Sequence, residues 1–394
     1  MDEIKTSKES KEKEQEVFIT DITIHKVRHL RNIRIPLSKD ERKHLILTGK
    51  NGSGKTSALQ SLEQYLTGKF GSQLGMLRPD SFYEGFDDKV QEVSLKLSPC
   101  KKINEYISRG HFIISYYGAK RQVEMTTPKG VNKINLKEKY GLHDHPGKEF
   151  HQYIVNLRAQ RAFANEKNDV KTIKKIENWF EIFENSLKEI FKDPSLRMAF
   201  DSENINFNIM QKGKDPFNFN TMADGYSALI DMVSDIILRM EKHKTKSYDL
   251  QGLVLIDELE THLHIDLQKK VFPFLTRFFP RIQFIVTTHS PFILNSIDNA
   301  IIYDLENKLL VEDLSGYSYD GIIEGYFRND LYSDSVKKDL ETYERLVHQK
   351  KRTEEEEERM MDLRIKLENI PDTLASELKV RFQQIELKRI RQHS

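Results

Sequence analysis

Cysteine is almost absent from this 394-residue sequence, in which Cys100 stands alone. One cysteine excludes an internal disulfide framework and a zinc site built from cysteines, and it is typical of a reducing compartment such as the cytoplasm. The sequence also lacks any apolar run of the roughly 18 residues that a membrane-spanning helix requires. Residues 1–16 mix lysine with glutamate and contain no apolar stretch, so they predict a disordered tail and not a signal peptide. These absences predict a soluble, cytoplasmic protein.

An excess of charge of either sign is missing as well, because 62 lysines and arginines balance 61 aspartates and glutamates to a formal net charge of +1. Without an overall positive field, any contact with nucleic acid has to come from a local patch. Small basic patches occur at Lys101-Lys102, at Lys120-Arg121 and over 171–175. Nucleic acid is therefore a possible partner that the composition does not indicate.

The order of the apolar segments predicts an α/β fold. Continuous apolar runs end at Leu47, Ile256 and Thr287, and each has the length and composition of a buried strand. Helical patterns lie between these runs, at Thr56–Leu66 and Tyr226–Met240. Buried strands that alternate with helices are the pattern of a parallel sheet covered by helices.

Other segments predict additions to this core. Alternating apolar residues over 17–37 predict two antiparallel strands joined near Arg31-Asn32, and apolar residues at helical spacing predict a helix over 172–191. Residues 68–140 predict an inserted arm, with one hairpin formed by Phe112–Tyr117 and Gln122–Met125. We therefore expect a main domain over 17–330, with this arm and a helical subdomain over 165–245, and a C-terminal appendage over 331–394.

The appendage is highly charged, and its most extreme run is Glu354–Glu358. Such a run is most simply a solvated helix face. Apolar residues at helical spacing predict helical or coiled-coil stripes that must be buried somewhere. The stripes are Leu340, Leu346, Leu363, Leu367, Leu374, Leu378, Phe382 and Ile385. The sequence leaves open whether they bind a partner or a second copy, or form a self-contained helical hairpin.

The segment from Gly49 to Thr56 matches the phosphate-binding pattern G-x-x-x-x-G-K-[ST] at every position, between a buried strand and a helix. Its glycines allow backbone N–H groups to point into one concavity, to which the helix adds its positive end. We expect Lys55 to reach the β- and γ-phosphates and Thr56 to bind Mg²⁺. The predicted nucleotide contacts are Gly49, Asn51, Gly52, Ser53, Gly54, Lys55, Thr56 and Ser57.

Two further strands end in chemically active side chains. The strand over 252–256 is followed by Asp257 and Glu258, which predict a Mg²⁺ ligand acting through water and a general base for the attacking water. The strand over 282–287 is followed by Thr288-His289, and a histidine at a strand tip can hydrogen-bond the γ-phosphate. The predicted catalytic residues are therefore Glu258 and His289.

Taken in this order, the motifs resemble those of the ABC-type ATPases over residues 17–330. The segment from Asp257 to His264 is similar to the D-E-P-E-x-H-L-H segment of a compact branch of that family. This branch includes the recombination protein RecF, the OLD nucleases, and ATPases of anti-phage systems such as Septu, retrons and PARIS. Residues 316–327 also resemble a segment of the defence ATPases. The resemblance implies an ABC-ATPase head that binds ATP and Mg²⁺ between the two copies of a homodimer.

The resemblance also implies two sites in which this sequence departs from the family. The signature loop L-S-x-G would be Met222 to Gly225, so Ala223, Asp224 and Gly225 would meet the partner's nucleotide, and Ala223 replaces the serine that donates a hydroxyl. This loss predicts slow hydrolysis. For the metal-binding Q-loop the sequence offers Gln160, after an expected strand, while Arg158 or Arg161 could be the contact instead.

Two functions compete on this basis. The first is a regulatory ATPase subunit of an anti-phage complex, in which ATP-held dimers scaffold or restrain an effector, with a nuclease encoded nearby as the expected partner. A nuclease within this chain is not expected, because no D-x-D cluster follows His289. The alternative is a RecF-like or SMC-like repair ATPase that clamps DNA. A transporter subunit is disfavoured by the Glu260 to His264 segment and by Ala223.

Overall fold

The computed structural model describes residues 15–75, 92–121, 125–243, 248–318, 321–322, 334–349, 351–369 and 376–392. The chain divides into two compact units, Met1–Tyr317 and Ser318–Ser394. The segment 316–327, which resembles the defence ATPases, lies mostly outside the described residues, as do residues 122–124 of the predicted hairpin.

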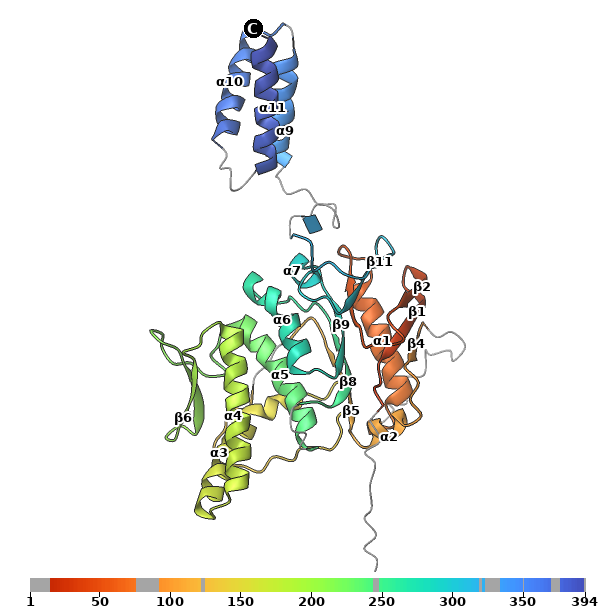
Figure 1. Ribbon diagram of the computed structural model, residues 1–394, viewed down its shortest axis with the longest axis vertical. Coiled ribbons are helices and arrows are strands. Elements are labelled where there is room, and N and C mark those ends of the chain that lie inside the picture. Colours follow the sequence, from red (N-terminus) through yellow and green to blue (C-terminus); the bar gives the residue numbers. More distant parts are fainter. Residues whose placement is uncertain are drawn as a thin grey trace, which may run out of the picture. The chain divides into compact units, whose positions relative to one another are not determined.

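A six-stranded sheet forms the centre of the first unit (Figure 1). Its strand order is β11-β10-β3-β9-β8-β5, and every neighbouring pair is parallel except β10 with β11. The strands are β3 (His44–Thr48), β5 (Phe112–Tyr117), β8 (Gln251–Ile256), β9 (Ile282–Thr287), β10 (Ala300–Asp304) and β11 (Leu309–Val311). Strands β3, β8, β9 and β10 are buried at every residue, as strands covered on both faces must be. The predicted α/β fold is confirmed.

Strand β5 corrects the predicted arm. Phe112–Tyr117 pairs in parallel with β8, from Phe112↔Gln251 to Tyr117↔Ile256, while most of its predicted hairpin partner lies outside the described residues. Strand β4 (Val93–Leu97) likewise joins β1. Two strands placed in an arm therefore belong to the core. The error arose because their partners are far away in sequence, and alternation of apolar residues does not reveal a distant partner.

An antiparallel sheet of order β2-β1-β4 lies against helix α1 (Lys55–Phe70). Strands β1 (Ile19–Val27) and β2 (Leu30–Pro36) form the predicted pair, with Ile22↔Ile35 and Ile24↔Ile33 in register. Their turn is at Arg28-His29, three residues before the predicted position. Arg28 adopts a left-handed conformation, with φ 49°, in this tight turn. Apolar residues of this sheet, of α1 and of one face of the central sheet form one core.

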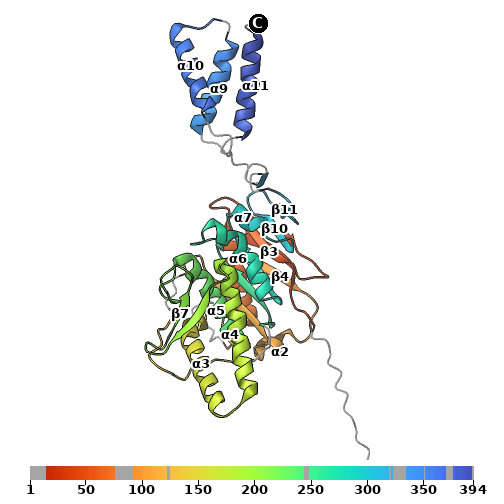
Figure 2. The ribbon, with the colours of Figure 1, turned by 60° about the vertical axis from the view of Figure 1, so that its left-hand side comes forward.

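Helices α5 and α6 cover the other side of the central sheet, and α3, α4 and the hairpin β6-β7 lie beyond them (Figures 1 and 2). Helix α4 (Val170–Phe191) confirms the helix predicted over 172–191, and its buried face includes Ile176, Phe183, Leu187 and Ile190. The other elements are α2 (Ile103–Ser108), η2 (Pro146–Glu149), α3 (Phe150–Glu166), β6 (Arg197–Asp201), β7 (Asn206–Met210), α5 (Asp224–Glu241), α6 (Ile265–Phe278) and α7 (Pro291–Leu294).

The second unit contains the helices α9 (Asp334–His348), α10 (Glu354–Glu368) and α11 (Ser376–Gln392), which pack on one another. The predicted stripe residues Leu340, Leu346, Leu363, Leu367, Phe382 and Ile385 are buried together in its core. These residues bury one another within the unit, as in the self-contained alternative that the sequence left open. The acids at 354–357 occupy the first turn of α10, where the helix dipole stabilises negative charge.

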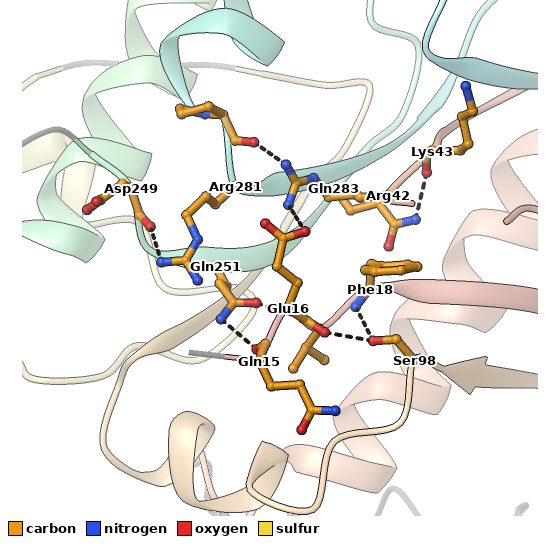
Figure 3. A network of polar contacts seen from close by, with 12 residues as sticks. Gln15, Glu16, Phe18, Arg42, Lys43, Ser98, Asp249, Gln251, Arg281 and Gln283 are labelled. Atoms are coloured by element: carbon orange, nitrogen blue, oxygen red, sulfur yellow. Dashed lines mark hydrogen bonds and ion pairs between the residues drawn. The ribbon is translucent and has the colours of Figure 1, made fainter. Parts of the chain in front are cut away.

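Two buried glutamines attach the N-terminal strand to the amino ends of the central strands (Figure 3). Gln251 accepts the N–H of Val17 at 2.7 Å, and Gln283 accepts the N–H of Ile19 at 2.6 Å. Gln251 also donates to the carbonyl of Gln15 at 3.1 Å. The ordered chain therefore includes Gln15 and Glu16, which were predicted to lie in a disordered tail.

The buried imidazole of His44 predicts a loss of stability in acid. Its Nδ1 accepts the N–H of Phe284 at 3.1 Å, and burial, with help from the charges of Arg42 and Lys43, lowers the pKa of His44 to about 3. The unfolded chain takes up this proton near pH 6.5, whereas the folded chain does so only near pH 3. As the pH is lowered from 6.5 toward 3, this one group should reduce the free energy of unfolding by about 1.4 kcal/mol for each pH unit.

Urea unfolding of the parent and of His44→Asn between about pH 4 and pH 7 tests this expectation. Asparagine can still accept the Phe284 N–H but does not titrate, so the stability of His44→Asn should depend less steeply on pH. His25→Asn, which changes an exposed histidine, should follow the parent. Equal slopes for the parent and His44→Asn would contradict the assignment.

Candidate active site

The predicted motifs meet at one edge of the central sheet. Strands β3, β9 and β8 are adjacent and parallel, and they lead directly into Gly49, Thr288 and Asp257. Because parallel strands place their carboxyl ends at the same edge, the P-loop, the Asp257-Glu258 pair and His289 converge there. This convergence is the site predicted from the three separate motifs.

The P-loop backbone depends on glycine. Gly49, Gly52 and Gly54 have φ values of 133°, 83° and 96°, in a region that other residues rarely adopt. A side chain at Gly49 would also place its Cβ 2.8 Å from Ser53 Oγ. The three glycines of the motif are therefore required by its conformation.

The loop and the start of α1 are suited to bind an anion. Helix α1 has no side-chain cap and no acidic residue in its first turn, and Ser53 Oγ is buried without a hydrogen-bond partner. Lys55 is 5% exposed, and its Nζ donates to the carbonyls of Gly49 at 2.9 Å and Lys50 at 3.0 Å. Burial lowers the pKa of Lys55, while the nearby carboxylates of Glu260 and Glu258 raise it. The loop thus combines a buried cation, an unpartnered hydroxyl and the uncapped start of a helix, all of which can bind an anion.

Thr56 and Asp257 form an oxygen-rich contact. Thr56 Oγ1 donates to Asp257 Oδ1 at 3.2 Å, and Thr287 Oγ1 donates to the same oxygen at 2.7 Å. Hydroxyl and carboxylate oxygens are the donors that Mg²⁺ prefers, and it commonly takes few protein ligands beside phosphate and water. The residues at this point fit a magnesium ion that arrives with a nucleotide.

Glu258 is held on a constrained backbone. Its φ of 48° lies in the left-handed region, and its N–H donates to Thr287 Oγ1 at 2.7 Å. Thr261 Oγ1 donates to the Glu258 carboxylate at 3.1 Å. The carboxylate and the main chain of this residue are therefore both tied to neighbouring side chains.

Glu260 fixes the residues at the carboxyl end of β9, a role that could not be identified from the sequence. Its carboxylate accepts the Thr288 hydroxyl at 2.7 Å and also the N–H of His289. Burial lowers the pKa of His289, and the charge of Lys55 lowers it further, against the opposite effect of the carboxylates. His289 is therefore a neutral imidazole near pH 7, able to donate one hydrogen bond and accept another.

The signature-like loop begins α5. Ala223 is the N-cap residue, with an extended backbone at φ −60° and ψ 142° and no side-chain cap. Gly225 packs closely against the loop that follows β8. A Cβ at this position would lie 2.6 Å from the carbonyl oxygen of His262. Within one chain the loop is thus set on the segment that follows Glu258, with Ala223 and Asp224 exposed.

Parts of this chain are similar in sequence to known proteins. Residues 118–295 match the family described as "AAA domain, putative AbiEii toxin, Type IV TA system", a range that begins after the P-loop. The chain is 28% identical over 313 residues to the Septu protein PtuA of Bacillus mycoides (strain KBAB4), covering 74% of this chain and 41% of that protein. It is 29% identical over 171 residues to the Retron Ec83 probable ATPase of Escherichia coli, covering 41% of this chain and 29% of that protein.

The chain is thus similar to the Septu protein PtuA and to the Retron Ec83 probable ATPase over these ranges. The resemblance inferred from the motifs is thereby confirmed, and each alignment spans less than half of the relative's length. Among solved structures, the SMC head domain from Thermotoga maritima is 14% identical, with a TM-score of 0.36, over 73% of this chain and 94% of that one. The SMC head bound to the C-winged helix domain of ScpA is 15% identical, with a TM-score of 0.38 and the same coverage.

Gln160, proposed for the metal through a Q-loop, does not follow a strand. It is an exposed residue within helix α3, and its neighbours have other contacts: the Arg158 guanidinium lies 5.8 Å from the centre of the Phe200 ring, and Arg161 pairs with Glu177. The apolar run before Gln160 predicts a strand, but it lies in helix α3, where residues 150–155 are buried all around the helix. A role for Gln160 at the metal stays an untested prediction.

Two residues near the site were not assigned to it from the sequence, although Arg121 was noted as part of a basic patch. His29 Nε2 donates to the carbonyl of Ser53 at 3.1 Å, so the turn between β1 and β2 touches the P-loop. Arg121, in the segment that follows β5, donates to the carbonyl oxygens of Asp257 and Glu258. The signal for Arg121 was its position after a parallel strand, which required the pairing of β5 to be known.

Across the described part of the chain, no helix combines the length and the apolarity needed to cross a bilayer.

Proposed function

We propose that this chain binds ATP with Mg²⁺ between two copies of itself and hydrolyses it slowly, as the regulatory ATPase subunit of an anti-phage system. The observation that carries the proposal is the convergence of the P-loop, Asp257-Glu258 and His289 at one sheet edge. The Septu and retron relatives support the defence setting.

The phosphates bind to the P-loop amides and to Lys55, whose Nζ leaves the loop carbonyls to reach the β- and γ-phosphates. Thr56 and Asp257 would hold Mg²⁺, and the bound ion would supply positive charge to the phosphate oxygens. Glu258 accepts the proton of the attacking water as that water forms a bond to the γ-phosphorus. The bond from the γ-phosphorus to its bridging oxygen breaks, and ADP leaves. His289 hydrogen-bonds the γ-phosphate from the side.

The second copy completes the site. Its Ala223, Asp224 and Gly225 approach the γ-phosphate with backbone N–H groups and the positive end of α5. No hydroxyl is available at Ala223, so closure is weaker than with serine. We expect turnover of the parent well below the roughly 10 s⁻¹ that is typical of enzymes.

Ala223→Ser should raise the rate of ATP hydrolysis about tenfold, because one added hydrogen bond to the transition state contributes about 1.4 kcal/mol. Phosphate release at saturating ATP measures it. A serine at this N-cap position would also stabilise α5, so Ala223→Asp is the matched control: it caps the helix but repels phosphate. Equal acceleration by both variants, or fast turnover of the parent, would contradict this role for the loop.

The expected partner is an effector nuclease encoded nearby, and the second unit is its expected docking site. Although the core of this unit is filled by its own side chains, Met361, Ile365 and Leu387 remain 52%, 58% and 57% exposed.

Deleting Ser333–Ser394 should leave ATP affinity unchanged and abolish co-purification with the effector. The double variant Met361→Lys and Ile365→Lys should weaken co-purification, whereas Leu309→Lys, at an exposed site in the first unit, should not. A truncated chain that keeps its effector would exclude this docking site.

The DNA-clamp alternative has less support. Of the basic patches on which it would rely, Arg121 is engaged with the main chain at Asp257 and Glu258 and is not available to bind phosphate.

A further inference from the structure

The left-handed backbone conformation of Glu258 has to be enforced by neighbouring groups. A left-handed φ of 48° in a residue with a Cβ is strained and persists only where the surroundings enforce it. The N–H side of this residue is held by Thr287 at 2.7 Å. The carbonyl side needs a second restraint.

Arg121 supplies that restraint. Its Nη2 donates to the carbonyl oxygens of Asp257 at 2.5 Å and of Glu258 at 2.9 Å, so one nitrogen holds both residues at the end of β8. Its Nε donates to the carbonyl of Gly118 at 3.1 Å, which fixes the guanidinium to the end of β5. Strands β5 and β8 are hydrogen-bonded neighbours up to this point, where the Asp257 N–H donates to the Tyr117 carbonyl at 2.8 Å.

The environment of Arg121 is unusual for a side chain that only braces a turn. Its Nη1 is buried and has no hydrogen-bond partner. Burial lowers the pKa of Arg121, and the carboxylates of Glu260, Asp257, Asp231 and Glu258 act in the opposite direction. The guanidinium nevertheless stays charged. Burying this charge together with an unpaired N–H donor is unfavourable unless other groups in the site interact with the charge and with the planar set of donors.

The geometry points to Arg121 as a positioning residue that holds Glu258 in its left-handed conformation and so aims the Glu258 carboxylate at the attacking water. This inference rests on the proposed ATPase function. Arg121 touches main-chain carbonyls and not the P-loop, so its effect should fall on the rate of the chemical step and not on ATP affinity. Lysine cannot replace it, because a single ammonium on a flexible stem does not reach three carbonyls in a fixed fork.

The experiment compares the parent, Arg121→Ala and Arg121→Lys in ATP affinity, in kcat, and in kcat with millimolar guanidinium added. We expect both variants to bind ATP as the parent does and to lose at least about tenfold in kcat, with guanidinium restoring part of the rate to Arg121→Ala only. Lys120→Ala removes an exposed charge from the preceding residue and should behave as the parent.

Each outcome decides the matter. A parent that binds no ATP refutes the proposed function itself. With an active parent, an unchanged kcat in Arg121→Ala overturns the positioning role, and so does an equal loss of ATP affinity. If Arg121→Ala does not fold, Arg121→Lys carries the test: a normal kcat in that folded variant overturns the inference, and a reduced kcat at normal affinity supports it.

Discussion

Lys55→Ala abolishes tight ATP binding, with an expected loss of affinity of at least about a hundredfold. Lys55 is a buried cation inside the P-loop, and its Nζ donates to the loop carbonyls of Gly49 and Lys50. Charge-assisted hydrogen bonds in a buried site contribute roughly 1.5–3 kcal/mol each, and two such bonds account for this loss. Titration with a fluorescent ATP analogue or calorimetry measures the affinity.

The matched control for this prediction is Lys50→Ala. Lys50 lies in the same loop, but its side chain is exposed and pairs with Glu306 at 3.2 Å, so the variant should bind ATP nearly as the parent does. Thermal unfolding shows whether Lys55→Ala is folded, since the carbonyls of Gly49 and Lys50 lose their donor. A folded Lys55→Ala variant with parental affinity would rule out the nucleotide site.

Glu258→Gln stalls hydrolysis and leaves ATP binding intact, with an expected fall in rate of about 10² to 10⁴, the usual contribution of a general base. The amide keeps the shape of the side chain and can still accept the Thr261 hydroxyl. It cannot accept a proton from water. Because ATP then stays in the site, the variant should accumulate as an ATP-bound dimer, which light scattering after size-exclusion chromatography measures.

Glu312→Gln is the control for this variant, because it makes the same change at an exposed acid away from the site. It should hydrolyse ATP as the parent does and show no trapped dimer. If Glu258→Gln hydrolyses ATP at the parental rate, Glu258 is not the base. If it is inactive yet monomeric with ATP bound, the base assignment stands and the two-copy site does not.

Features of this protein that are encoded locally in the sequence could be predicted, and features that depend on distant contacts could not. The P-loop was predicted residue by residue, because the left-handed glycines, the lysine and the helix start act within eight consecutive positions of one chain segment. Helix α4 was predicted closely for the same reason, since its apolar face repeats along the segment itself. Gln160 shows the limit: the buried residues before it have the composition of a strand, but they belong to α3.

By itself, the sequence determined the α/β class, the P-loop, and the residues Asp257, Glu258 and His289, because each is written into one short strand-and-turn segment. Only the tertiary structure decided that β5 joins the central sheet, that Arg121 and Glu260 fasten the ends of β8 and β9, and that the C-terminal stripes bury one another. Those features arise from contacts between residues far apart in the chain. Burial of apolar surface is non-directional, so it selects such partners through the fit of the whole fold and not through a local pattern.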